Sequence, residues 1–129
     1  MKTLISLFAL FLSLSLIAQT NPATWYFNDT SGSGIQSPTS TATGIYSTAM
    51  GSNATASGDF ATAMGSDNEA SGNISTAMGG GTTASGDFAT AMGNYTTASG
   101  YSSTAMGNST TASGNNSTAM GYLSIASGK

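Results

Sequence analysis

Cysteine and histidine are both absent from the 129-residue chain. Without cysteine there are no disulfide bonds, no thiol chemistry and no cysteine-linked lipid anchor; without histidine, the usual metal ligand and proton shuttle are missing. Charged residues make up only 5% of the chain, five acidic against two basic, and no basic patch is present. Nucleic acid and anionic lipid are therefore not expected as partners, and we predict no cofactor and no metal site.

The same shortage limits catalysis. An enzyme without cysteine or histidine would need paired carboxylates, or a serine activated by a lysine. Apart from Lys2, the one lysine in the chain is the terminal Lys129. We therefore expect no enzymatic activity.

Long apolar runs are absent except at the start of the chain. A single run extends from Leu4 to Ile17, directly after the positive Lys2. Its length of about fourteen residues falls short of the roughly twenty that span a bilayer. The pattern predicts a secretory signal peptide over residues 1–18, an exported mature protein beginning near Gln19, and no membrane insertion by the rest of this segment.

What the chain does contain is a repeat. From Ser40 to the end, the seven-residue phrase xTAxGxx recurs thirteen times, with alanine at position 3 and glycine at position 5 in every copy. Position 4 alternates between methionine and a small hydroxyl residue, so the true period is fourteen. Such regularity argues against a disordered linker and predicts a solenoid of stacked units. We assign residues 40–129 to about 6.5 coils of this solenoid, and residues 19–39 to an N-terminal cap or linker.

The heptad does not fit a helix, because the glycine in every copy would destabilise it by about 1 kcal/mol relative to alanine. In an extended chain, positions 1, 3 and 5 face one way and positions 2 and 4 face the other. The first set is small throughout, except for Asn68. This predicts an all-β fold: a flat roll of two five-residue strands per coil, turns at positions 6 and 7 where the preceding glycine supplies the unusual conformations, and coils stacked about 4.8 Å apart.

The two outward faces of this roll are predicted to differ in chemistry. One displays threonine and methionine, and the other displays threonine and serine. The side predicted to associate with identical chains presents Met50, Met64, Met78, Met92, Met106 and Met120. The side predicted to be the outer binding face presents Thr55, Ser57, Thr83, Ser85, Thr97, Ser99, Thr111 and Ser113.

Six methionines in a column would be an unusual apolar patch on a soluble monomer. Their burial against identical chains offers at most on the order of 10 kcal/mol. An interior of alanine and glycine supplies little transfer free energy, so we expect the oligomer to be obligate. Binding of a soft metal by the column is disfavoured, because such sites need converging ligands.

A few residues depart from the repeat. Asn68 and Glu69 replace a small residue and a threonine, and with Asp67 they predict a small acidic spot on the outer sheet. We interpret it as sequence drift, because a calcium site needs several converging oxygens. Large aromatic side chains fall in the predicted turns along the edges, where we expect them to wedge between chains: Phe60, Phe88, Tyr95, Tyr101 and Tyr122. Trp25, Tyr26 and Phe27, in the segment without repeats, are expected to cap the first coil.

Units such as STAMGNSTTASGNN, residues 103–116, resemble the YadA-like head repeat of trimeric autotransporter adhesins. The shared pattern is a small residue, alanine, an apolar residue and glycine, followed by a small residue, alanine, any residue and glycine, and it covers residues 40–129. The resemblance implies a left-handed parallel β-roll assembled as a homotrimer. In that trimer the methionines take the family's interface role, and Thr55, Thr83, Thr97 and Thr111 take the outer face.

From this resemblance we expect an exported adhesin head at the bacterial cell surface or outer membrane, attaching to host matrix, cells or abiotic surfaces. The family normally continues into a neck, a coiled-coil stalk and a membrane barrel segment. This sequence stops at Lys129, inside a repeat, so either a fragment of an anchored protein or a secreted head is consistent with it. Two other functions stay open: ice binding through the threonine and serine face, and a passive fibre or spacer segment.

Overall fold

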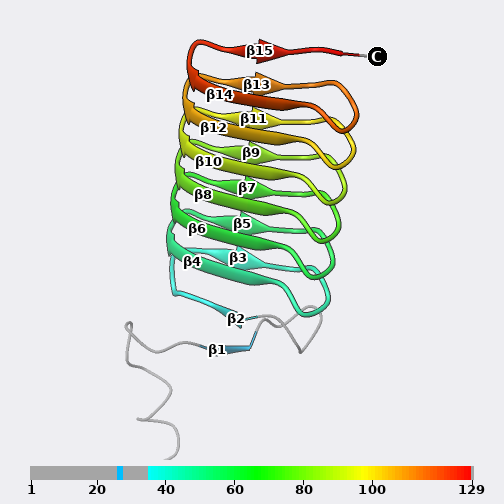
Figure 1. The fold of residues 1–129 in the computed structure, drawn as a ribbon. Coiled ribbons are helices and arrows are strands. Elements are labelled where there is room, and N and C mark those ends of the chain that lie inside the picture. The colour runs from blue at the N-terminus through cyan, green and yellow to red at the C-terminus, as the bar shows by residue number, and fades with distance from the viewer. Residues whose placement is uncertain (1–25, 28–34, 129) are drawn as a thin grey trace, which may run out of the picture.

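A computed structural model of the chain describes residues 26–27 and 35–128. Within these residues the chain is a parallel β-solenoid of about seven coils, without helices (Figure 1). This confirms the predicted all-β solenoid and its fourteen-residue coil. The predicted signal peptide and most of the predicted cap, Trp25 included, lie outside the described residues.

Two sheets lie back to back along the solenoid (Figure 1). The eight-stranded sheet, here named the methionine sheet, contains in order β1 (Tyr26–Phe27), β2 (Ile35–Gln36), β4 (Thr48–Ser52), β6 (Thr62–Ser66), β8 (Thr76–Gly80), β10 (Thr90–Asn94), β12 (Thr104–Asn108) and β14 (Thr118–Tyr122). The seven-stranded sheet, here named the serine sheet, contains β3 (Thr41–Ala42), β5 (Thr55–Ala56), β7 (Glu69–Ala70), β9 (Thr83–Ala84), β11 (Thr97–Ala98), β13 (Thr111–Ala112) and β15 (Ile125–Ala126).

The two strands of a coil are unequal in length, so the prediction of two five-residue strands was wrong for one sheet. Strands of the methionine sheet from β4 onward have five residues, whereas those of the serine sheet have two. The difference arises at the corners. After each serine-sheet strand the chain enters a β-turn, as at Gly58, whose carbonyl oxygen accepts a hydrogen bond from the Ala61 N–H (3.2 Å). The N–H groups of Ser57 and Gly58 both donate to the Ala70 carbonyl oxygen of the next coil (3.0 and 3.2 Å), so the regular ladder ends there and the turn begins.

The N-terminal edge of the methionine sheet is paired within the described residues. Strand β2 is parallel to β4, with Ile35 opposite Thr48, one residue short of the fourteen-residue spacing. Strand β1 is antiparallel to β2, with Phe27 opposite Ile35. The methionine sheet therefore begins before the first sequence repeat.

The interior of the solenoid contains only small side chains. Position 3 alanines from Ala42 to Ala119 are buried, together with most position 1 residues, and the largest fully buried side chain is Asn68. Positions 1 and 3 thus point inward as predicted. With so little apolar volume, the parallel hydrogen-bond ladders between coils supply much of the cohesion.

The glycine at position 5 points inward only in the serine-sheet segments. The prediction that it also does so in the methionine-sheet strands was wrong. Glycines that end the serine-sheet segments, such as Gly58 and Gly86, are buried. Glycines that follow a methionine, such as Gly51 and Gly93, are exposed and have φ near +123°. They belong to the long strand, and their backbone geometry turns it toward the corner.

The left-handed residue of each turn is position 7, which also corrects the expectation that glycine provides it. Residues at this position have φ between about 50° and 63°, and from Tyr46 to Leu123 only Gly81 among them is a glycine. Even the β-branched Ile74 adopts φ of 56°. Stacking of each turn on the neighbouring coils holds these residues in a conformation that isolated chains disfavour.

Candidate association and binding surfaces

The methionines form one continuous column on the outside of the methionine sheet. Each pairs in register with the next, from Met50 opposite Met64 to Met106 opposite Met120. The first five are half-buried, because neighbouring coils partly cover them, whereas Met120 on the last complete coil is 60% exposed. The apolar area open to a partner is therefore smaller than six fully exposed side chains would offer.

The predicted outer face lies on the serine sheet, with a consistent pattern of exposure. Thr55, Thr83, Thr97 and Thr111 are half-buried, and the serines two residues after them are exposed: Ser57, Ser85, Ser99 and Ser113. Glu69 stands in register between Thr55 and Thr83 and interrupts the threonine column. The structure thus brings the eight predicted residues onto one face, on the opposite side of the roll from the methionines.

Asn68 is fully buried rather than part of an acidic spot on the surface. Its Nδ2 donates hydrogen bonds to the carbonyl oxygens of Met64 (2.6 Å) and Gly79 (2.8 Å). Its Oδ1 accepts hydrogen bonds from the N–H and the Oγ1 of Thr82, both at 2.9 Å. All the hydrogen-bonding capacity of this large residue is used inside the roll, which explains how it fits among small neighbours.

The corner that follows the methionine strands is mostly polar. Asn53 Nδ2 donates a hydrogen bond to Asp67 Oδ1 (2.9 Å), and Ser66 Oγ donates one to Asp67 Oδ2 (2.8 Å). These hydrogen bonds, that of Asn53 first, lower the pKa of Asp67 below its usual 3.8. The ring of Tyr95 lies close over Gly81, so close that a Cβ on Gly81 would stand 2.8 Å from it.

The opposite corner carries a column of large apolar side chains, here named the apolar ridge: Tyr46, Phe60, Ile74, Phe88 and Tyr101. Their exposed fractions lie between 47% and 63%. Tyr46 packs against Phe60 with ring centroids 5.3 Å apart, and Phe88 packs edge-on against Tyr101 at 5.4 Å. Sequence reasoning singled out only three of the five. Tyr46 and Ile74 were missed, although they recur at the same fourteen-residue spacing as Phe60 and Phe88.

A ladder of side-chain hydrogen bonds supports this corner. Asp59 Oδ1 accepts a hydrogen bond from the Ile45 N–H (2.9 Å), and Asn73 Oδ1 accepts one from the Asp59 N–H (3.1 Å). In the same way, Asp87 Oδ1 accepts a hydrogen bond from the Asn73 N–H (2.9 Å), and Asn115 Oδ1 accepts one from the Tyr101 N–H (3.1 Å). The Asp or Asn side chains at position 6 of these four turns therefore tie each coil to the preceding one, whereas the turn that has Tyr101 at this position makes no such hydrogen bond.

Neither a metal cluster nor a membrane-spanning helix is found in the described part of the chain. No three His, Cys, Asp or Glu side chains between residues 35 and 128 gather closely enough to hold a metal ion. Likewise, no helix there is both long and apolar enough to cross a bilayer.

These features define a two-faced β-solenoid repeat protein, whose flat sheets and edges offer extended surfaces for interaction. The family model for the YadA head domain repeat, described as two copies, matches residues 42–68, 70–96 and 98–124. These segments make up more than half of the chain, and the chain belongs to this family, the head repeats of trimeric autotransporter adhesins. The resemblance seen in the sequence is thereby confirmed. A search of curated proteins found no match.

Proposed function

We propose that this chain forms the adhesive head of an exported homotrimer displayed at the bacterial surface. In the proposed assembly the methionine sheet faces the threefold axis and the serine sheet faces outward to contact host matrix, cells or other surfaces. Family membership supports an adhesin-type role. The observation that carries the assignment of the two faces is the strict difference between them, with methionine at position 4 of one sheet and serine or threonine at position 4 of the other.

The energetics agree with this assignment. Interfaces between obligate subunits favour methionine and aromatic side chains, whereas short hydroxyl side chains are common on solvated surfaces. The roll has no large apolar residue in its interior, so the stability missing from each protomer has to come from association. A column spanning six coils distributes that contact along the whole head.

A matched pair of double substitutions tests the trimer. Replacing Met78 and Met92 with aspartate would place two charges on each protomer in a desolvated interface, which is strongly unfavourable. We expect light scattering after size exclusion to show monomeric or unfolded chain. Replacing Ser85 and Ser99 with aspartate introduces the same two charges at exposed positions and should leave the trimer intact. Equal loss of assembly in both variants would contradict the assignment of the two faces.

The same serine variant tests attachment. Beads coated with the mature protein should adhere to at least one of three targets: immobilised matrix proteins, cultured cells or an abiotic surface. The variant with Ser85 and Ser99 replaced by aspartate is expected to remain trimeric and to adhere less, because its changes lie on the proposed contact face. Adhesion unaffected by these changes would mean that the serine sheet is not the contact face.

Ice binding is not favoured. An ice-binding array needs an uninterrupted flat column of hydroxyls, and here Glu69 stands between Thr55 and Thr83. Threonine also occupies position 2 of the methionine sheet, as at Thr76 and Thr90, where it would serve no purpose in ice contact. Thermal hysteresis together with ice shaping, measured on the purified protein, would favour ice binding instead.

A further inference from the structure

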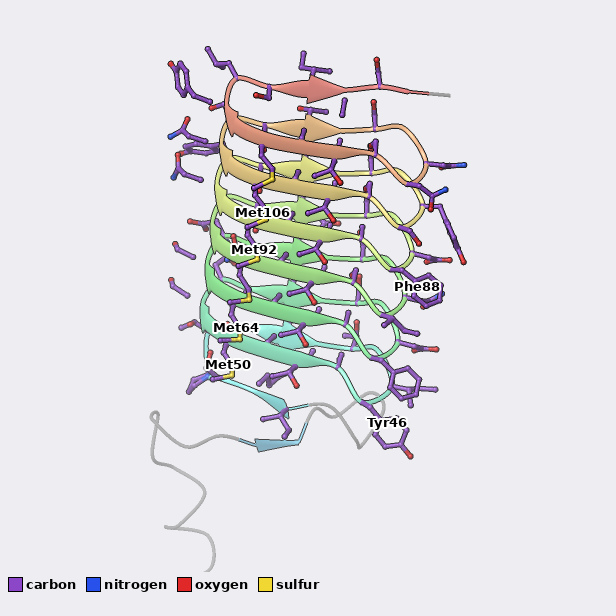
Figure 2. The ribbon with its side chains drawn as sticks, in the orientation of Figure 1. Tyr46, Met50, Met64, Phe88, Met92 and Met106 are labelled. Carbon is purple, nitrogen blue, oxygen red and sulfur yellow. The ribbon has the colours of Figure 1, made fainter. Side chains whose placement is uncertain are left out.

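The apolar ridge and the methionine column belong to neighbouring parts of each coil: the ridge lies in the turn before the long strand, and the methionine is the central residue of that strand. Figure 2 shows Met50, Met64, Met92 and Met106 in one column along the methionine sheet, while Tyr46 and Phe88 project from the turns at one edge of that sheet. Each ridge residue precedes the long strand of its coil, and each methionine follows within that strand, as Phe88 and Met92 do around β10. One protomer therefore presents two different apolar columns, one at an edge and one on a face.

The two columns match coil by coil. The coil containing Met50 contributes Tyr46 to the ridge, and the coils of Met64, Met78, Met92 and Met106 contribute Phe60, Ile74, Phe88 and Tyr101. Because both columns repeat with the stacking of the coils, they have the same axial spacing. Two copies set side by side could therefore bring ridge and column together along five coils without any mismatch in length.

The ridge has too much exposed apolar surface to be explained by the fold of one chain. Its five side chains are each about half exposed, they lie on five successive coils, and two neighbouring pairs of rings are in contact. At the other corner position 7 holds Asn53, Asp67, Gly81, Tyr95, Ser109 and Leu123, so large apolar side chains there do not follow one another from coil to coil. Contiguous apolar surface of this kind marks an interaction site. Methionine sulfur is a favourable neighbour for aromatic rings, and ring closure in a cyclic oligomer needs two different surfaces that complement each other.

We infer that the apolar ridge of one copy packs against the methionine column of the next copy, so that three identical head-to-tail contacts close the ring. This inference rests on the proposed trimer and specifies how its subunits meet. The partner is a second copy of this chain. The polar corner, with Tyr95 and Tyr122, then lies outside the direct ridge contact, so the five turn aromatics expected to wedge between chains divide into two groups.

Cysteine pairs test the contact, because the natural chain has no cysteine. The double variant Phe88→Cys/Met92→Cys places one thiol on the ridge and one in the column. The two positions are four residues apart, with Phe88 in the turn and Met92 the third residue of β10; residues 89–92 alone extend over roughly 10 Å, which is too far for a disulfide within one chain. Oxidation, or a short bis-maleimide reagent, should then link neighbouring copies and give covalent trimers on a denaturing gel.

Three controls make the result specific. Phe88→Cys alone and Met92→Cys alone should give little cross-linking. In the proposed contact a ridge residue faces a methionine of the next copy, so two thiols at the same position do not meet. Phe88→Cys/Ser99→Cys, with its second thiol on the serine sheet, should also give little. Should the first double variant fail to fold, Phe60→Cys/Met64→Cys provides the same geometry two coils earlier.

The outcomes separate this inference from the proposed function. If light scattering shows a trimer but one of the single variants, Met92→Cys or Phe88→Cys, cross-links by itself, the proposed trimer stands and the ridge contact is wrong. A monomer in light scattering would overturn both. Replacing Phe60 and Phe88 with serine should raise the concentration at which the trimer half-dissociates by at least about tenfold, as for central interface aromatics. An unchanged trimer that has lost adhesion would instead make the ridge a ligand site, and would also overturn the inference.

Discussion

Replacement of Gly93 by alanine should disrupt the stacking of coils, and its effect can be worked out from the geometry. Gly93 has φ of +123°, and a Cβ built on it would overlap the carbonyl oxygen of Gly107 in the next coil. Two unfavourable terms therefore add. The positive φ destabilises an alanine by about 1–3 kcal/mol, and forcing apart two coils in hydrogen-bonding contact adds about 1–3 kcal/mol or more. We expect a loss of about 2–6 kcal/mol in the free energy of unfolding.

Gly121 supplies the matched control. It occupies the same position of the repeat and has φ of +106°, but the nearest atom to its Cβ would be the Oγ of Ser124, 3.7 Å away. Gly121→Ala therefore retains the conformational term and removes the overlap, so that about 1–3 kcal/mol is expected. Gly80→Ala, with ordinary φ and only the Nδ2 of Asn94 at 3.3 Å, should be close to neutral.

Urea unfolding followed by far-UV circular dichroism measures these differences. All variants should be compared at one protein concentration, because association contributes to the apparent stability. The reasoning predicts the order Gly93→Ala, then Gly121→Ala, then Gly80→Ala, from the most to the least destabilised. Losses for the first two that agree within about 0.5 kcal/mol would show that contact between coils is not what excludes a side chain at Gly93.

Two further predictions concern single side chains. The Oγ1 of Thr96 is buried without a hydrogen-bond partner, whereas that of Thr82, one coil earlier in the same column, donates to Asn68 Oδ1. Thr96→Val should thus be neutral or stabilising by up to about 1 kcal/mol, and Thr82→Val destabilising by about 1 kcal/mol. Equal effects in urea unfolding would mean that the Asn68 hydrogen bond contributes nothing. Leu123 is 60% exposed and has φ of 54°, a conformation that asparagine tolerates better than leucine. Leu123→Asn should therefore stabilise the protein by about 1 kcal/mol and raise its thermal midpoint. A lowered midpoint would refute the assumed strain.

The repeat in the sequence was enough to predict the architecture. A glycine in each heptad excluded a helix, and strict alternation of methionine with serine or threonine predicted fourteen-residue coils with two different faces. Those inferences hold because stacking in parallel register places chemically equivalent residues beside each other, as with Met78 and Met92. A residue type that recurs at this period therefore forms a column, inside the roll for the alanines of position 3 and on its surface for the methionines.

The corners were decided by tertiary structure. Glycine recurs identically at position 5, yet Gly58 is buried beside a β-turn and Gly51 is exposed in a long strand. The identity of the residue cannot distinguish them, because the difference comes from the two unlike bends that close one coil. The unequal lengths of the two strands follow from the same cause.

The sequence by itself determined the solenoid, its period and its two faces, because these depend on local periodicity that repeats thirteen times. Tertiary structure alone decided that Asn68 is satisfied inside the roll, since its partners Met64, Gly79 and Thr82 lie in other strands. It alone also placed Tyr101 in the ridge: Tyr46, Phe60, Ile74 and Phe88 recur at the fourteen-residue period, whereas Tyr101 stands one position earlier in its repeat and meets Phe88 only because the coils stack.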